Sequence, residues 1–142
     1  MPRPPKQTAQ SSRMPQPLGI SEAEWEVIKV IWDRGGALTA GELVTALLES
    51  APHRRWRPRT IKTLLSRLVK KGAVRCEIKD KRYLYHAAIA RDTAVRREAR
   101  SFLARVFDGA LVPAVVTFLK ESDLSSDEIE QLKHILESEA KR

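Results

Sequence analysis

The clearest pattern of apolar and polar positions lies in residues 57–72. Four apolar residues recur there with the period of an α-helix: Ile61, Leu64, Leu65 and Leu68. At this spacing they form one stripe along a helix, and such a stripe faces a core. Pro58 suits the first position of a helix, and Gly72 suits the left-handed residue that ends one. The pattern therefore predicts an amphipathic helix with well-marked ends.

Two earlier helices are predicted from capping boxes and apolar periodicity. Ser21 with Glu24, and Thr39 with Glu42, have the spacing at which a hydroxyl and a carboxylate bind the free N–H groups of a helix start. The first helix is expected within residues 18–34. The apolar faces comprise Trp25, Ile28, Ile31 and Trp32 in the first helix, and Leu43, Val44, Leu47 and Leu48 in the second. All of these side chains are expected in one core with the stripe.

Beyond Gly72 the period of the apolar residues changes from helical to alternating. Val74, Cys76 and Ile78 alternate with charged residues, and a turn at Asp80-Lys81 precedes a second run at residues 83–86. This pattern predicts a β-hairpin. Three helices followed by a hairpin with a basic tip are the winged form of the helix-turn-helix. The expected fold is therefore mainly α with a small β-hairpin (α+β).

Three more apolar segments follow the predicted hairpin. Helical spacing runs from Val95 to Phe107, residues 111–120 are apolar enough to be buried on most sides, and Ser125 with Glu128 makes a third capping box. Helices outside the first core need another surface against which to bury their apolar faces. A two-fold partner would provide it, as in dimeric helix-turn-helix proteins. The expected organisation is a winged-helix DNA-binding domain at 18–89 and a helical dimerisation region at 90–142.

Positive charge is concentrated in one part of the chain. The net charge of the 142 residues is +8, yet residues 52–86 hold twelve Lys or Arg against two acids, and residues 101–142 hold five against eight. On the predicted helix, the face opposite the apolar stripe carries cations and hydroxyls and no acid. A solvated helix face normally mixes both signs, so this face indicates a polyanionic partner, which we infer to be DNA. The face and its shoulders comprise Arg59, Lys62, Thr63, Ser66, Arg67 and Lys70.

The N-terminal residues and the apolar content bound the other possibilities. Residues 1–17 hold five of the eight prolines, three cations and no acid, a composition typical of a disordered basic tail. No apolar run reaches the roughly 18 residues of a membrane span, and no hydrophobic secretory core is present. The sequence therefore predicts a cytoplasmic protein without membrane insertion.

Catalysis is the first alternative to DNA binding. Cys76 is the single cysteine, which excludes an internal disulfide and a Cys cluster for zinc or copper. Cys76 could approach His86 across the hairpin, and such a pair is typical of a nucleophile or a metal ligand set. No third orienting group or Gly-rich phosphate loop accompanies the pair. The sequence favours a protein that is not an enzyme and binds no metal or cofactor.

A winged helix that binds only protein is the second alternative. Such a module would present a neutral or mixed face on its third helix. The acid-free face of residues 57–72 therefore favours DNA over a protein partner.

Three stretches of the chain resemble the penicillinase and methicillin-resistance repressor family, which also includes copper-responsive repressors. They are residues 21–32, 60–72 and 80–85, and the resemblance spans about residues 18–139. It implies a homodimeric transcriptional repressor that binds a double-stranded DNA operator. The family's contacts from the third helix would fall on Arg59, Thr60, Lys62, Thr63, Ser66 and Arg67. Beside them, the charge pattern adds Lys70 on the helix and Lys79 and Arg82 on the hairpin as DNA-binding residues.

Two departures from the family pattern bear on regulation. The copper-responsive branch ends in paired Cys-x-Cys motifs, which this chain lacks, so direct metal sensing is not expected. Control of an unrelated stress or metal operon, without metal binding, stays an alternative. In the antibiotic-responsive branch a membrane-bound sensor protease cuts an Asn-Phe bond. The matching bond here is Thr117-Phe118, where Phe118 fits and Thr117 departs from the pattern.

Overall fold

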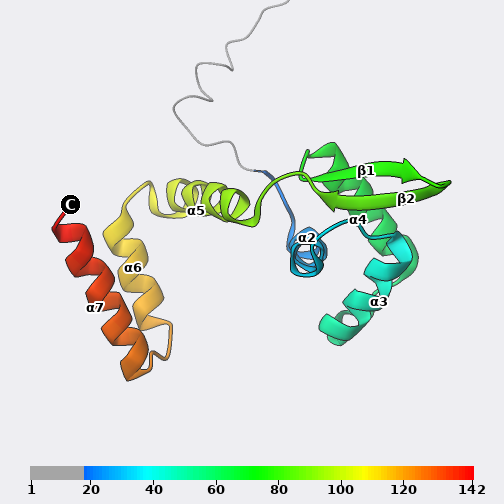
Figure 1. Ribbon diagram of the computed structural model, residues 1–142. Coiled ribbons are helices and arrows are strands. Elements are labelled where there is room, and N and C mark those ends of the chain that lie inside the picture. The colour runs from blue at the N-terminus through cyan, green and yellow to red at the C-terminus, as the bar shows by residue number, and fades with distance from the viewer. Residues whose placement is uncertain (1–17) are drawn as a thin grey trace, which may run out of the picture. The chain divides into compact units, whose positions relative to one another are not determined.

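The computed structural model describes residues 18–142, which form two compact units (Figure 1). The expected tail at 1–17 lies outside the described residues. The first unit ends at Ser101, and the second comprises Phe102–Arg142. Together the described residues contain six α-helices, one short 3-10 helix and a two-stranded sheet. The expected class, mainly α with a small β-hairpin, is confirmed.

The first unit contains the predicted helices in the predicted order. Both expected capping boxes are formed, by Ser21 with Glu24 and by Thr39 with Glu42. The elements are α2 (Glu22–Arg34), α3 (Ala40–Ser50), η1 (Pro52–Arg54), α4 (Pro58–Lys70), β1 (Val74–Lys79), β2 (Arg82–Ala87) and the first part of α5 (Arg91–Phe107).

The core of this unit lies between α2, α3 and α4. The four residues of the predicted α4 stripe are all buried there, as are Ile28, Ile31, Leu43 and Leu47. Two expectations were wrong in detail. Leu48 is 49% exposed and Ala46 is buried in its place, because the face that α3 turns to its neighbours is rotated from the predicted one. Trp25 and Trp32 pack only at the edge of the core, where their ring centroids lie 5.9 Å apart.

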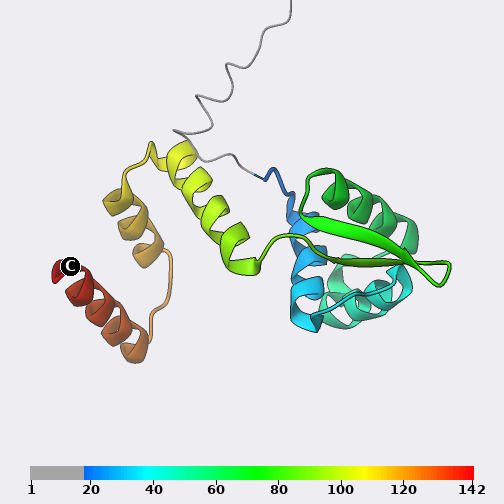
Figure 2. The same cartoon turned by 45° about the horizontal axis from the view of Figure 1, so that its top comes forward.

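The hairpin is antiparallel, and its turn has the predicted position. Asp80 and Lys81 both have positive φ, 53° and 64°, as a two-residue hairpin turn requires. Tyr85 and Leu38 exchange backbone hydrogen bonds of 2.9 and 2.7 Å, which fasten β2 to the segment between α2 and α3. Both views show the turn extending beyond the helices (Figures 1 and 2). Three helices with this hairpin form the expected winged helix-turn-helix.

The second unit contains the end of α5, α6 (Leu111–Lys120) and α7 (Ser126–Ala140). The third predicted capping box, Ser125 with Glu128, is present. The expectation that residues 111–120 are buried on most sides is wrong for one chain, because its neighbouring helices cover only part of α6. Ala114 is the one buried residue of α6, and Phe118 is 52% exposed.

Among the described residues, no single helix is long and apolar enough to cross a membrane. Only α5 and α6 taken together, as a pair bent at the break between them, pass that test of length and composition.

Candidate nucleic-acid interface

One side of α4 is buried and the other presents the predicted DNA-binding residues to solvent. The packing of the apolar stripe fixes the rotation of the helix, because Ile61, Leu65 and Leu68 have no exposed surface. Every predicted DNA-binding residue of α4 is exposed: Arg59, Thr60, Lys62, Thr63, Ser66, Arg67 and Lys70. Arg59, Lys62, Thr63 and Ser66 line one open depression on this surface. These four residues, which the helical period places on one side of the helix, are therefore neighbours in space.

The cations of this surface are available to a partner. Among residues 18–142, none of the four cations of the α4 face is in an ion pair: Arg59, Lys62, Arg67 and Lys70. A face that held both signs would neutralise part of its own potential through pairs at i,i+4. Here no acid offsets the positive potential of the face, which suits attraction of a polyanion.

The hydroxyl groups of α4 have distinct hydrogen-bonding capacities. Thr63 Oγ1 donates to the carbonyl oxygen of Arg59 at 3.1 Å, so its proton is used within the helix. Its methyl group and its oxygen lone pairs still face solvent. Thr63 can therefore contact a thymine methyl or accept a hydrogen bond from a base.

The start of α4 also suits an anion. Arg57 is the N-cap residue without a side-chain cap, and the first turn holds no acid. Helix-start N–H groups that lack a side-chain acceptor bind anionic oxygen atoms well, and the helix dipole adds to the attraction. Arg57 is exposed and was not among the predicted DNA-binding residues, although its place directly before Pro58 was a usable signal.

The hairpin supplies a second group of cations. Lys79 and Arg82 are directly opposite each other in the register, and both are exposed. Like charges at such positions repel, which destabilises a bare hairpin. A phosphate group between or beside them would remove that repulsion. The pKa of Glu42, at the start of α3, lies below its usual value mainly because its carboxylate accepts a hydrogen bond from the Thr39 backbone N–H. The positive charge of Arg82 lowers this pKa further.

The suggested cysteine–histidine pair is not formed. The register sets Cys76 opposite Tyr85, whereas His86 Nε2 lies 3.0 Å from Glu77 Oε1. Cys76 and His86 therefore point to opposite faces of the hairpin, because side chains alternate along a strand. Burial, and then the neighbouring Cys76, raises the pKa of Tyr85. Among the described residues no three His, Cys, Asp or Glu side chains gather as a metal site would require.

Comparison with known proteins identifies the family. The family model described as penicillinase repressor matches residues 20–138. The methicillin resistance regulatory protein MecI of Mammaliicoccus sciuri is 35% identical over 117 residues, which cover 82% of this chain and 92% of that protein. The penicillinase repressor of Bacillus licheniformis is 36% identical over 123 residues, covering 87% and 93%. The names of these relatives are those of a regulatory protein and a repressor, not of enzymes.

Two solved structures are similar to a little over half of this chain. The DNA-binding domain of the repressor BlaI is 35% identical, covers 55% of this chain and 90% of its own, and gives a TM-score of 0.46. Bacillus licheniformis BlaI, in its monomeric form in complex with the blaP half-operator, is also 35% identical, covers 56% and 88%, and gives 0.43. The resemblance inferred from the sequence is confirmed, and the chain belongs to the penicillinase repressor family.

Proposed function

We propose that this chain is a homodimeric, sequence-specific repressor that binds a double-stranded DNA operator through α4 and the hairpin. The observation that carries this proposal is the exposed, acid-free face of α4, held outward by a fully buried stripe on the opposite side. An α-helix fits the major groove, where each base pair presents a distinct pattern of donors and acceptors. A relative that is 35% identical was solved in complex with a half-operator, which supports the same role here.

The residues of the interface divide into two roles. The candidates for contacts with base edges are the exposed polar residues of α4 before Lys70, namely Arg59, Thr60, Lys62, Thr63, Ser66 and Arg67. Arg67 in particular could donate two hydrogen bonds to one guanine. Lys70, Lys79 and Arg82 are the candidates for phosphate contacts. Such contacts fix the position of the protein on DNA without reading its sequence.

The second unit is the proposed dimerisation region. Its helices α6 and α7 leave many large apolar side chains exposed, and clustered apolar surface of this kind marks sites of protein–protein contact. The exposed apolar residues of α6 and α7 are Leu111, Val112, Val115, Val116, Phe118, Leu119, Ile129, Leu132, Ile135 and Leu136. A second copy would cover this surface and join two DNA-binding units, so that each reads one half of a two-fold operator.

Regulation is proposed to act on this dimerisation region. The names of the relatives favour an operon for resistance to β-lactam antibiotics, and the family resemblance favours a membrane-bound sensor protease as the partner. The candidate bond, Thr117-Phe118, lies inside α6, and Thr117 Oγ1 donates to the carbonyl oxygen of Pro113 at 2.9 Å. Cleavage there needs local opening of α6. It would also separate Phe118 from the residues before it in the helix.

The test is selection of bound duplexes from a random pool by the full-length protein. A two-fold repeated motif is expected, and each half should lose base preference when Arg67 is replaced by Ala. Recovery of sequences without a shared motif would contradict sequence-specific binding. Recovery of a single unrepeated motif would contradict the dimer only.

A further inference from the structure

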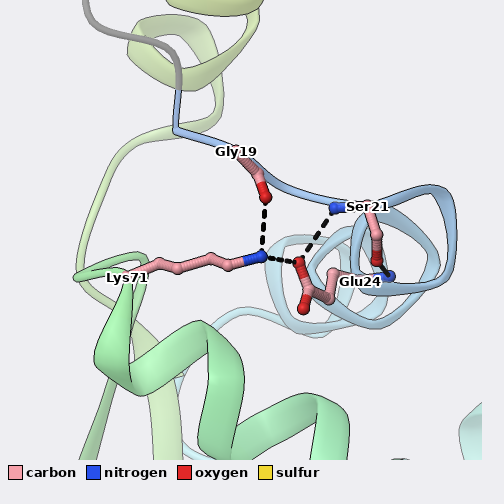
Figure 3. A network of polar contacts seen from close by, with 4 residues as sticks. All are labelled: Gly19, Ser21, Glu24 and Lys71. Atoms are coloured by element: carbon pink, nitrogen blue, oxygen red, sulfur yellow. Dashed lines mark hydrogen bonds and ion pairs between the residues drawn. The ribbon is translucent and has the colours of Figure 1, made fainter.

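One lysine beside the α4 face does not point toward the proposed DNA. Lys71 is the C-cap residue of α4, directly after Lys70. Its Nζ atom lies 2.5 Å from Glu24 Oε1 and 2.6 Å from the carbonyl oxygen of Gly19 (Figure 3). The side chain therefore joins the end of α4 to the start of α2, across 47 positions of sequence.

The acceptor of this lysine is an unusual residue for a core. Glu24 is 1% exposed, and a carboxylate at such a position is costly unless it is paired and hydrogen-bonded. Its Oε1 atom accepts from Lys71 and also from the backbone N–H of Ser21 at 2.9 Å (Figure 3). Burial alone would raise the pKa of Glu24, but these hydrogen bonds and the charge of Lys71 hold that pKa below its usual value. At neutral pH Glu24 is therefore ionised, and its Oε1 atom accepts two hydrogen bonds.

The backbone at the end of α4 is fixed at the same point. The N–H groups of Gly72 and Ala73 donate to the carbonyl oxygens of Val69 and Leu68, at 3.0 Å each, and Gly72 has φ 80°. This is the Schellman arrangement, in which a left-handed glycine ends a helix. Lys71 is thus held on both sides, by the helix end and by Glu24. Two of the three donors of its amine are held by Glu24 and Gly19, so the side chain would have to leave this pair to extend toward a phosphate.

We propose that Glu24 and Lys71 are positioning residues for DNA recognition: their ion pair fixes the C-terminal end of α4 against α2, and Lys71 makes no DNA contact. The inference rests on the proposed function of α4. Base contacts require side chains to be held within a fraction of an ångström, and second-layer contacts commonly provide that precision. Loss of the pair lets the end of α4 shift, so discrimination between DNA sequences falls while attraction to phosphates remains.

The experiment compares Lys71→Met with Lys70→Met, its neighbour on the exposed face. Binding to a duplex selected by the wild-type protein, and to a scrambled duplex of equal length, is measured over a range of salt concentrations. Lys70→Met is expected to make the fall of log affinity with log salt less steep, by about 0.9 for each bound DNA-binding unit. Lys71→Met is expected to leave that slope unchanged and to lower the ratio of the two affinities at least tenfold. A purely structural loss would lower both affinities equally and leave the ratio unchanged.

Glu24→Gln is the second variant, because it keeps an oxygen for the Ser21 N–H and removes only the charge. Circular dichroism fixes a temperature at which each variant is folded, and if Lys71→Met does not fold, Glu24→Gln carries the test alone. A smaller loss of the same affinity ratio is expected. The proposal is overturned if Lys71→Met reduces the salt slope as Lys70→Met does, or if the folded variants keep the wild-type ratio. Failure of the wild-type protein itself to prefer the selected duplex would instead contradict the proposed function.

Discussion

Replacement of Phe118 by Asp is expected to separate the proposed dimer and to end tight operator binding without any change in α4. The Phe118 ring lies 6.1 Å from that of Phe102 and 6.2 Å from that of Phe107. Each aromatic pair contributes about 0.5–1.5 kcal/mol, so loss of both pairs costs about 1–3 kcal/mol within one chain. Phe118 is also 52% exposed in the single chain, which leaves about half of it for a partner.

The cost in the dimer is larger than the cost within one chain. A carboxylate buried at the interface without a partner costs several kcal/mol, and the two-fold axis doubles the number of such groups. A separated monomer also loses the linkage between two half-sites, which contributes a factor of about 10²–10⁴ to affinity. Affinity for a full two-fold site should fall by that factor, while affinity for a half-site stays close to the wild-type value.

The assay is sedimentation velocity of Phe118→Asp beside band-shift titrations of the same sample on full and half sites. Lys120→Asp, a larger change of charge at the polar end of the same helix, is the matched control and should stay dimeric. Two results would refute the reasoning: a Phe118→Asp variant that remains dimeric, or one that is monomeric and yet binds the full site as tightly as the wild type.

Two other predictions concern the roles of single side chains. Lys79→Ala and Arg82→Ala should weaken binding to all duplexes about equally, whereas Arg67→Ala and Thr63→Ala should cost about 1–3 kcal/mol on the selected duplex and relax base preference; reversed effects in quantitative band shifts would exchange the two roles. Because the pKa of folded Glu24 lies below the usual value of 4.5, its ionised form stabilises the fold above that pH, and this stability is lost as the pH falls through the lowered value. The melting temperature of Glu24→Gln should therefore lie below that of the wild type at neutral pH and approach it in acid, and a constant difference across that range would contradict the assignment.

Features set by neighbouring residues were predictable from the sequence. The three capping boxes depend on side chains three positions apart, and all three are formed. The α4 stripe and the hairpin turn at Asp80-Lys81 likewise follow from local spacing. Because the stripe fixes the rotation of α4, the exposure of the basic face opposite to it was predictable as well.

Features set by distant residues were not predictable from periodicity. The exposure of Leu48 depends on which side of α3 meets α2 and α4, and the Glu24–Lys71 pair joins residues far apart in sequence. The hairpin register decides that Cys76 faces Tyr85 and not His86. The exposure of Phe118 has a different cause, since its apolar surroundings indicate burial that one chain does not provide. In each case the outcome depends on a contacting surface that is distant in sequence or belongs to a second chain.

The salt dependence of binding tests most directly whether the cations of α4 and the hairpin bind DNA. Two units that each place several of these cations on phosphates make roughly 6–10 contacts, for which affinity falls by about 10³–10⁵ between 50 and 200 mM salt. The measurement is a titration of the selected duplex by fluorescence anisotropy across that range, with the wild-type protein. A linear fall of log affinity with a steep slope is the expected result, and an affinity that does not change with salt would contradict the assignment of this surface to DNA.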